Sequence, residues 1–189
     1  RQFAEEAMAG LTAILLVFSA LAMIAMPWLT LVNAPGFYDE PEKFDLTVFL
    51  TRVTFPYLMC MSLVALLSGV LNSLNKFIVA ALAPTLFNLT LIAALGLAWW
   101  LGAGSSALTG KLLAWGVFVA GILQLVLLWD SARRAGFGLK PAWPTYTADM
   151  RQLVALGVPG LIAGGVTQIN LQIGGMIASF QDGAVSYLY

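Results

Sequence analysis

The sequence predicts an all-α integral membrane protein, a polytopic bundle of transmembrane helices with five full helices and the start of a sixth. Of its 189 residues, 60% are hydrophobic and 10% are charged. In a typical soluble domain about a quarter of the residues are charged, so this composition is not that of a soluble domain. The mean hydropathy is +0.89. The charges are grouped, and the uncharged segments between the groups are long enough to cross a bilayer as helices.

The clearest pair of helices lies within residues 50–88. Residues 53–75 carry no charge. As a helix they would be about 35 Å long, against a hydrocarbon core of about 30 Å. A short polar break around Lys76 separates them from a second hydrophobic run, and such a short connection joins antiparallel neighbours. We therefore expect helices over about 47–73 and 77–101 that form a hairpin.

Three further helices are expected outside this hairpin. The first covers about 7–32 and ends at a turn signal around Pro35. The second covers about 108–131 and the third about 148–179. A new apolar stretch occupies residues 184–189, which we interpret as the start of the next helix. This pattern predicts that the chain is a piece of a larger protein.

Two connecting segments are polar and opposite in charge. Residues 34–46 carry four acidic side chains and one lysine, which is typical of a solvated loop. Residues 133–147 are basic, aromatic and rich in glycine and proline, which suits an interfacial linker. If successive helices cross the membrane in alternating directions, six basic residues lie on the same side as the 133–147 linker and three on the opposite side. The six are Arg1, Lys76, Arg133, Arg134, Lys140 and Arg151, and the three are Lys43, Arg52 and Lys111. Because Lys and Arg are in excess on the cytoplasmic side, we expect the linker and the residue 1 end to be cytoplasmic, and the 34–46 loop to face outward.

The composition disfavours several classes of function. The net charge is zero, so no overall field favours nucleic acid. Histidine is absent, which removes the usual general base and the commonest metal ligand. Cys60 lies in an apolar run and is interpreted as a small buried residue. We expect no cofactor and no enzymatic activity, and a metal site in the acidic loop is a disfavoured alternative.

Three residues of the hairpin are candidates for a substrate cavity. Arg52 either snorkels to the headgroups or faces inward as a cation for an anionic group such as a phosphate. Pro84 leaves the Ala80 carbonyl without its helical donor, so a kink is expected. Asn88 lies one turn further on the same face. Because an amide is costly in lipid, Asn88 either bridges two helices or lines a cavity.

The helix over 148–179 carries a stripe of small and polar residues at the helical period, namely Gly165, Gln168, Gln172, Gly175 and Ser179. The stripe either packs against another helix or lines a hydrated cavity, and Gln168 and Gln172 favour the cavity. A bend or hinge is expected near the start of this helix, at Pro159, Gly160, Gly164 and Gly165.

A milder stripe of the same kind lies on the helix over 47–73. Its members are Ser62, Ala65, Gly69 and Ser73. Because small residues let helix backbones approach closely, we interpret this stripe as a packing surface only.

A series of motifs runs through the chain in order, namely Asn33-Ala34-Pro35-Gly36-Phe37, Thr54-Phe55-Pro56-Tyr57, Leu71-Asn72-Ser73, Ala83-Pro84 with Asn88, Gly157 with Pro159, and Gly183-Ala184-Val185-Ser186-Tyr187. Together they resemble the MurJ (MviN) family of bacterial lipid II flippases. The resemblance implies a transporter of the MOP superfamily with fourteen helices, of which this chain supplies the third to the seventh. Residues 1–132 would then hold helices of the N-terminal lobe, 133–147 a cytoplasmic linker, 148–179 a helix leading towards the second lobe, and 184–189 the start of the eighth helix.

For function, the resemblance implies an inner-membrane protein that moves lipid II to the outer leaflet by alternating access. Its implied partners are lipid II, an undecaprenyl-pyrophosphate-linked precursor, and the membrane lipids, with membrane potential or a coupling ion rather than ATP as the drive. Pro84, Asn88 and Ser186 are the residues that the resemblance carries over, and at Arg52 the family tolerates lysine. The alternatives are another MOP-type transporter, such as a polysaccharide-lipid flippase or a drug exporter, and a membrane scaffold that transports nothing.

Overall fold

The computed structural model describes residues 2–137, 155, 165, 168–169 and 171–180. In this part of the chain all regular structure is helical, which confirms the predicted all-α membrane bundle. Among the described residues, which leave out most of the helix expected over 148–179, four segments are long and apolar enough to cross a membrane, namely Ala4–Ile24, Pro41–Ser73, Phe77–Trp100 and Ala107–Arg134. The chain is therefore a multi-pass membrane protein.

The chain forms two compact units, each built from two separate segments. The first unit comprises Arg1–Leu21 and Leu50–Thr145, and the second comprises Ala22–Phe49 and Tyr146–Tyr189. The first unit contains most of α1 (Gln2–Ile24) and all of α4 (Tyr57–Ser73), α5 (Phe77–Trp100) and α6 (Ala107–Arg134). The second contains α2 (Met26–Asn33), the short 3-10 helix η1 (Pro35–Phe37) and the first part of α3 (Pro41–Thr54), with a helical stretch at 171–178.

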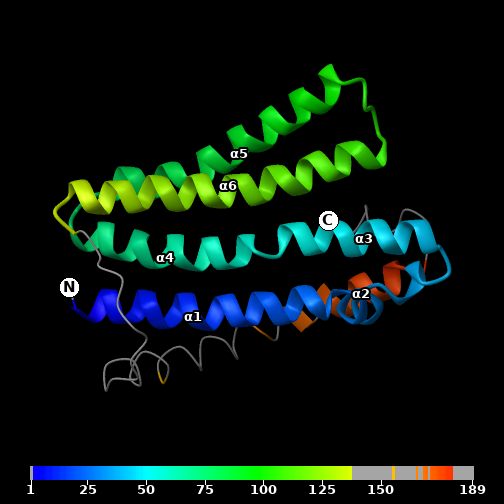
Figure 1. The fold of residues 1–189 in the computed structure, drawn as a ribbon, viewed down its shortest axis with the longest axis horizontal. Helices are drawn as coiled ribbons and strands as arrows, with labels where there is room; N and C mark the ends of the chain where they lie inside the picture. The colour runs from blue at the N-terminus through cyan, green and yellow to red at the C-terminus, as the bar shows by residue number, and fades with distance from the viewer. Residues whose placement is uncertain (1, 138–154, 156–164, 166–167, 170, 181–189) are drawn as a thin grey trace. The chain divides into compact units, whose positions relative to one another are not determined.

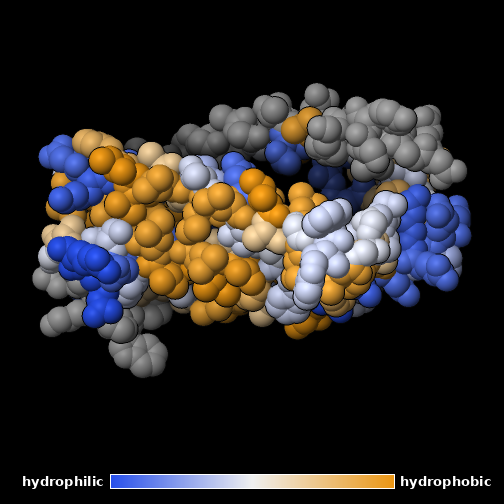
Figure 2. All heavy atoms as spheres, turned by 90° about the horizontal axis from the view of Figure 1, so that it is seen from above, coloured by the Kyte–Doolittle hydropathy of each residue, from blue (hydrophilic) through white to orange (hydrophobic). Residues whose placement is uncertain are grey.

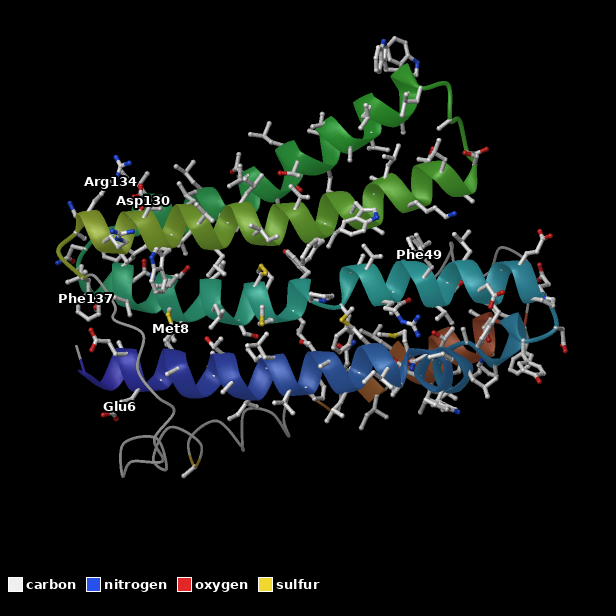
Figure 3. All side chains as sticks on the ribbon, in the orientation of Figure 1. Glu6, Met8, Phe49, Asp130, Arg134 and Phe137 are labelled. Carbon is white, nitrogen blue, oxygen red and sulfur yellow. The ribbon has the colours of Figure 1, made fainter. Side chains whose placement is uncertain are left out.

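The core of the first unit lies where α1, α4, α5 and α6 meet (Figure 1). Leu67 and Leu71 of α4 are fully buried there, as is Leu128 of α6. Met8 points from α1 towards α4 (Figure 3). Outside this core the surface is apolar: Figure 2 shows hydrophobic residues over the middle of the unit and hydrophilic residues at the end where α6 finishes. Such a surface suits a lipid environment.

Close helix contacts in this unit depend on glycines of α6. A Cβ on Gly121 would lie 2.7 Å from the Tyr57 ring and 3.0 Å from the Cys60 Cβ, both on α4. A Cβ on Gly116 would lie 3.0 Å from the Ala94 Cβ on α5. Small residues at helix contacts let the backbones approach, which is how helices associate where lipid removes the hydrophobic driving force.

Two of the expected helices are interrupted by prolines. The helix expected over 7–32 is divided at Ala25, whose ψ is 2°, and α2 begins there with Pro27 in its first turn. The helix expected over 47–73 already begins at Pro41 and breaks before Tyr57. In both cases the proline supplies no N–H and its ring clashes with the carbonyl four residues earlier.

A third proline is accommodated without a break. Pro84 lies inside α5, which is continuous from Phe77 to Trp100. Figure 1 shows α5 leaning away from α6 towards its Trp100 end. Only Ala83 and Ala98 of this helix are buried, so α5 presents most of its surface to its surroundings.

Candidate functional site

The structure describes five of the six cavity candidates. Ser186 lies outside the described residues, as do the hinge candidates Pro159, Gly160 and Gly164. The fourth hinge candidate, Gly165, is described and is partly exposed. The remaining candidates lie on α3, on α5 and in the segment before and within the 171–178 helix.

Arg52 lies in the last turn of α3, directly before the break that separates α3 from α4. Its side chain is partly buried. Because Pro56 has no N–H, the Arg52 carbonyl is the group that loses its helical donor at the break. Arg52 therefore places a cationic side chain within one turn of the break between α3 and α4.

The break itself is held by aromatic contacts to three helices. The Phe55 ring lies 5.9 Å from the Phe18 ring on α1, measured between centroids. The Tyr57 ring lies 5.4 Å from the Phe87 ring on α5 and also contacts the site of Gly121 on α6. The motif Thr54-Phe55-Pro56-Tyr57 thus forms the break between α3 and α4, and packing against α1, α5 and α6 fixes its position.

Pro84 and Asn88 are both exposed on one face of α5. That face takes no part in the core of the first unit. An exposed carboxamide on a membrane-spanning helix is costly against lipid and needs a polar or hydrated neighbour. Asn88 therefore marks a face of α5 that is open among the described residues and unsuited to lipid.

Gln124 is a buried polar residue that sequence reasoning missed. It lies on α6 with 1% of its surface exposed, and its Nε2 donates a hydrogen bond of 2.6 Å to the Ala83 carbonyl on α5. Its Oε1 is buried and accepts no hydrogen bond from the described residues. Pro84 has no N–H, so the carbonyl that lacks its helical hydrogen-bond donor is that of Ala80. The Gln124 side chain bonds to the Ala83 carbonyl instead, so it links α6 to α5 next to Pro84 but does not replace the hydrogen bond that Ala80 lacks. The sequence did carry a signal for it, because Gln124 is a polar side chain in the middle of the uncharged segment between Lys111 and Asp130.

The stripe on the last described helix is exposed at one end and buried at the other. Gln168 is exposed and Gln172 is partly exposed, whereas Ser179 is buried. The Ser179 Oγ accepts a hydrogen bond of 3.1 Å from the Gly36 N–H and donates one of 2.6 Å to the Met176 carbonyl. The Ser179 end of the stripe therefore packs within the second unit, whereas Gln168 and Gln172 make no such contact with any residue that the structure describes.

Gly36 occupies a position that only glycine fits. A Cβ there would overlap the backbone carbonyl of Ser179, which cannot move aside as a flexible side chain can. The motif Asn33-Ala34-Pro35-Gly36-Phe37 therefore packs, through Gly36, against Ser179 at the end of the 171–178 helix.

The interpretation of Ser62, Ala65, Gly69 and Ser73 as a packing surface is wrong for the described residues. Ala65, Gly69 and Ser73 are exposed, and a Cβ on Gly69 would meet no atom within 4 Å. The buried face of α4 is instead the one with Cys60, Leu63 and Leu67. On that face Cys60 lies opposite Gly121 of α6, and Leu63 and Leu67 belong to the core.

Known proteins match the chain along its whole length. The family model described as "Lipid II flippase MurJ" matches residues 1–189. The probable lipid II flippase MurJ of Rhizobium tropici is 47% identical over 189 residues, which is 100% of this chain and 35% of the relative. That of Rhizobium meliloti is 43% identical over the same shares. The lipid II flippase MurJ of Burkholderia cenocepacia is 32% identical over 92% of this chain and 34% of its own length.

These matches agree with the order of motifs in the sequence and with the apolar helices of the structure. The chain spans about a third of the length of the curated relatives that it matches. Because the family model covers every residue, the match rests on the whole chain rather than on one motif. The chain belongs to the MurJ family of lipid II flippases.

Proposed function

We propose that the chain is part of a longer transporter that moves lipid II from the cytoplasmic to the outer leaflet of the bacterial inner membrane by alternating access. The observation that carries this proposal is the family match along all 189 residues. The relatives that match the whole of this chain, over 35% of their own length, are named as probable lipid II flippases. In this proposal the protein is a transporter and not an enzyme, and membrane potential or a coupling ion drives it.

The geometry supports such a task. A flippase has to hide a large polar headgroup from lipid, which requires a hydrated cavity and helices that bend. The break before Tyr57 divides the membrane-spanning segment Pro41–Ser73 into two shorter helices, and a second break at Ala25 separates α1 from α2. The proposed cavity residues are those predicted from the sequence, namely Arg52, Pro84, Asn88, Gln168, Gln172 and Ser186, and the proposed hinge residues are Pro159, Gly160, Gly164 and Gly165.

Arg52 is the cation that we assign to the pyrophosphate of the substrate. Its side chain is partly buried and lies within one turn of the break between α3 and α4. A guanidinium group pairs well with phosphate oxygens. The family's tolerance of lysine here indicates that the charge matters more than the fork geometry.

The proposed orientation puts the residue 1 end and the 133–147 linker in the cytoplasm and the 34–46 loop in the periplasm. Arg133 and Arg134 at the end of α6 and Lys76 at the start of α5 support it, since basic residues are in excess on the cytoplasmic side. At the other end of α5, Trp99 and Trp100 are 83% and 77% exposed, which is typical of the opposite interface.

The same proposal divides the chain by lobe. Residues 1–132 would belong to the N-terminal lobe and 133–147 would link it to the 148–179 helix, which leads towards the second lobe. Residues 184–189 would begin the eighth helix.

The test is lipid II export in cells depleted of their own flippase and supplied with the full-length protein. We expect lipid II to appear on the outer leaflet, measured with an enzyme or antibiotic that reaches only that leaflet. A protein present in the membrane at normal level that exports no lipid II would contradict the proposal. Export of an O-antigen-type lipid-linked glycan by that protein would identify it as a sister transporter, and a protein that moves neither would be a scaffold.

A further inference from the structure

A small basic pocket lies in the first unit where α4 ends, α5 begins and α6 ends. Its volume is about 230 Å³ and it is lined by Leu71, Lys76, Val79, Ser131, Arg134 and Ala135. Three helix ends therefore contribute to one site. None of the six cavity candidates lines this pocket.

The end of α4 places Lys76 at the pocket. Asn75 adopts a left-handed conformation with φ of 58°, which turns the chain sharply after α4. The Lys76 N–H then donates a hydrogen bond of 2.8 Å to the Leu71 carbonyl, which is the pattern of a Schellman C-cap. The Lys76 side chain is exposed at this turn, directly before the first residue of α5.

The end of α6 places Arg134 there in the same way. Gly136 has φ of 80°, and the Phe137 N–H donates a hydrogen bond of 2.9 Å to the Ala132 carbonyl. Phe137 packs back onto the core of the unit, which fixes this helix end. Figure 3 shows Arg134 and Asp130 extending from the last turns of α6 while Phe137 lies beside the end of α4. The backbone positions that carry the two cations are thus fixed by helix caps and by the packing of Phe137.

The charge of the pocket is positive. Asp130 lies 2.7 Å from the Arg134 Nε and neutralises part of it, but the two terminal nitrogens of the guanidinium remain as donors. Lys76 adds a second cation. The first turn of α5 has no side-chain cap, so its backbone N–H groups add donors and a positive dipole end at Val79. The Ser131 hydroxyl is used within α6, where it donates to the Leu127 carbonyl.

This set of donors fits a tetrahedral phosphate. A lysine supplies a compact charge, and an arginine supplies a planar fork that matches two oxygens. The pocket lies at the end of membrane-spanning helices, where the surrounding phosphates belong to lipid headgroups. Basic pockets between transmembrane helices bind such headgroups.

We propose that this pocket binds the phosphate of an anionic phospholipid, on the side of the membrane where α4 and α6 end. The proposal requires the chain to span a membrane and does not depend on lipid II transport. The alternative is a general attraction of anionic lipid to all the basic residues at this end of the unit. Arg133 separates the two explanations, because it lies next to Arg134 on α6 but lines a different, apolar groove.

The test is native mass spectrometry of the purified full-length protein in a neutral detergent, titrated with phosphatidylglycerol. We expect Lys76→Gln and Arg134→Gln each to weaken binding about tenfold, since each removes one charge-assisted contact. Arg133→Gln removes the same charge from the same turn and should bind like the unmodified protein. Equal weakening in all three variants, or none in the first two, would overturn the proposal.

Three controls keep the result specific. Lys76→Arg keeps the charge and should restore binding, which separates a lost contact from a folding defect. Asp130→Asn removes the competing carboxylate and should tighten binding about threefold; weaker binding would contradict the assigned charge balance. Excess inorganic phosphate should not displace phosphatidylglycerol, and displacement would show that the site takes free phosphate instead of a lipid.

Discussion

Helices α5 and α6 are neighbours of similar apolar character, yet they are used in opposite ways. In the most apolar stretch of α6, 33% of the residues are buried. In the corresponding stretch of α5, only 6% are buried. The difference follows from position: α6 packs against both α4 and α5, with Gly121 and Gly116 at the two contacts, whereas the face of α5 with Pro84 and Asn88 is exposed among the described residues. In a membrane, hydrophobicity places a helix in the bilayer, and close approach at small residues decides what it packs against. We therefore regard α6 as the scaffold of the unit and the face of α5 with Asn88 as its open side.

The largest effect is expected where α6 is packed most tightly. Gly121→Ala should destabilise the protein by about 1–3 kcal/mol, because its methyl group would meet the Tyr57 ring and Cys60. Gly96→Ala on α5 is the matched control, since a Cβ there meets nothing within 4 Å. It should stabilise the helix by about 0.5–1 kcal/mol. Thermal unfolding in detergent, followed by fluorescence-detected chromatography, measures both, and equal effects would remove the distinction between the two helices.

The next effect concerns the charge of Arg52. Arg52→Glu should abolish lipid II export at normal membrane expression, because it replaces the proposed pyrophosphate partner with a repelling carboxylate. Arg52→Lys should export clearly more than Arg52→Glu. An active Arg52→Glu variant would leave only headgroup snorkelling as the role of this residue.

A smaller effect separates the two amides on α5 and α6. Asn88→Leu should lower export about tenfold with unchanged stability, because the open face loses a polar group of the cavity. Gln124→Leu should change stability by less than about 1 kcal/mol, since it removes the bond to Ala83 together with an unpaired buried oxygen. Lipid II export and thermal unfolding are measured for both variants. Unchanged export by Asn88→Leu would show that Asn88 does not line a cavity that transport needs.

The smallest effect is expected in the stripe of the last described helix. Gln168→Cys should react with a water-soluble thiol reagent faster than Ile169→Cys, although both positions are exposed in the chain. Gln168 belongs to the proposed cavity, and Ile169 lies about 100° further round the helix. Equal rates would favour helix packing, the alternative explanation of the stripe.

The fold was predictable from the sequence because charge-free intervals report directly which segments can enter a bilayer. The same intervals could not reveal the interruptions at Ala25 and before Tyr57, since an uncharged segment crosses the membrane whether or not its helix is continuous. Proline positions were visible, but Pro84 leaves its helix intact whereas Pro56 does not. Only the packing around each proline separates the two outcomes.

The candidate site was less predictable, because it depends on which face of each helix finds a partner. The polar character of Asn88 and Gln168 was readable, and the structure exposes both. The burial of Gln124 was not readable, since it follows from the approach of α6 to α5 at Gly116 and Gly121. The misassigned stripe around Gly69 has the same cause: small residues permit close packing, but they do not supply the partner helix.

The most direct test of the open face of α5 is cysteine labelling from the aqueous phase. Asn88→Cys and Leu89→Cys are compared in a background that lacks other cysteines and carries Cys60→Ala. Both positions are exposed, so lipid and water are distinguished by the reagent and not by burial. A membrane-impermeant thiol reagent should label Asn88→Cys strongly and Leu89→Cys weakly, with lipid II slowing the first reaction. Equally weak labelling at both positions would contradict a hydrated cavity on this face of α5.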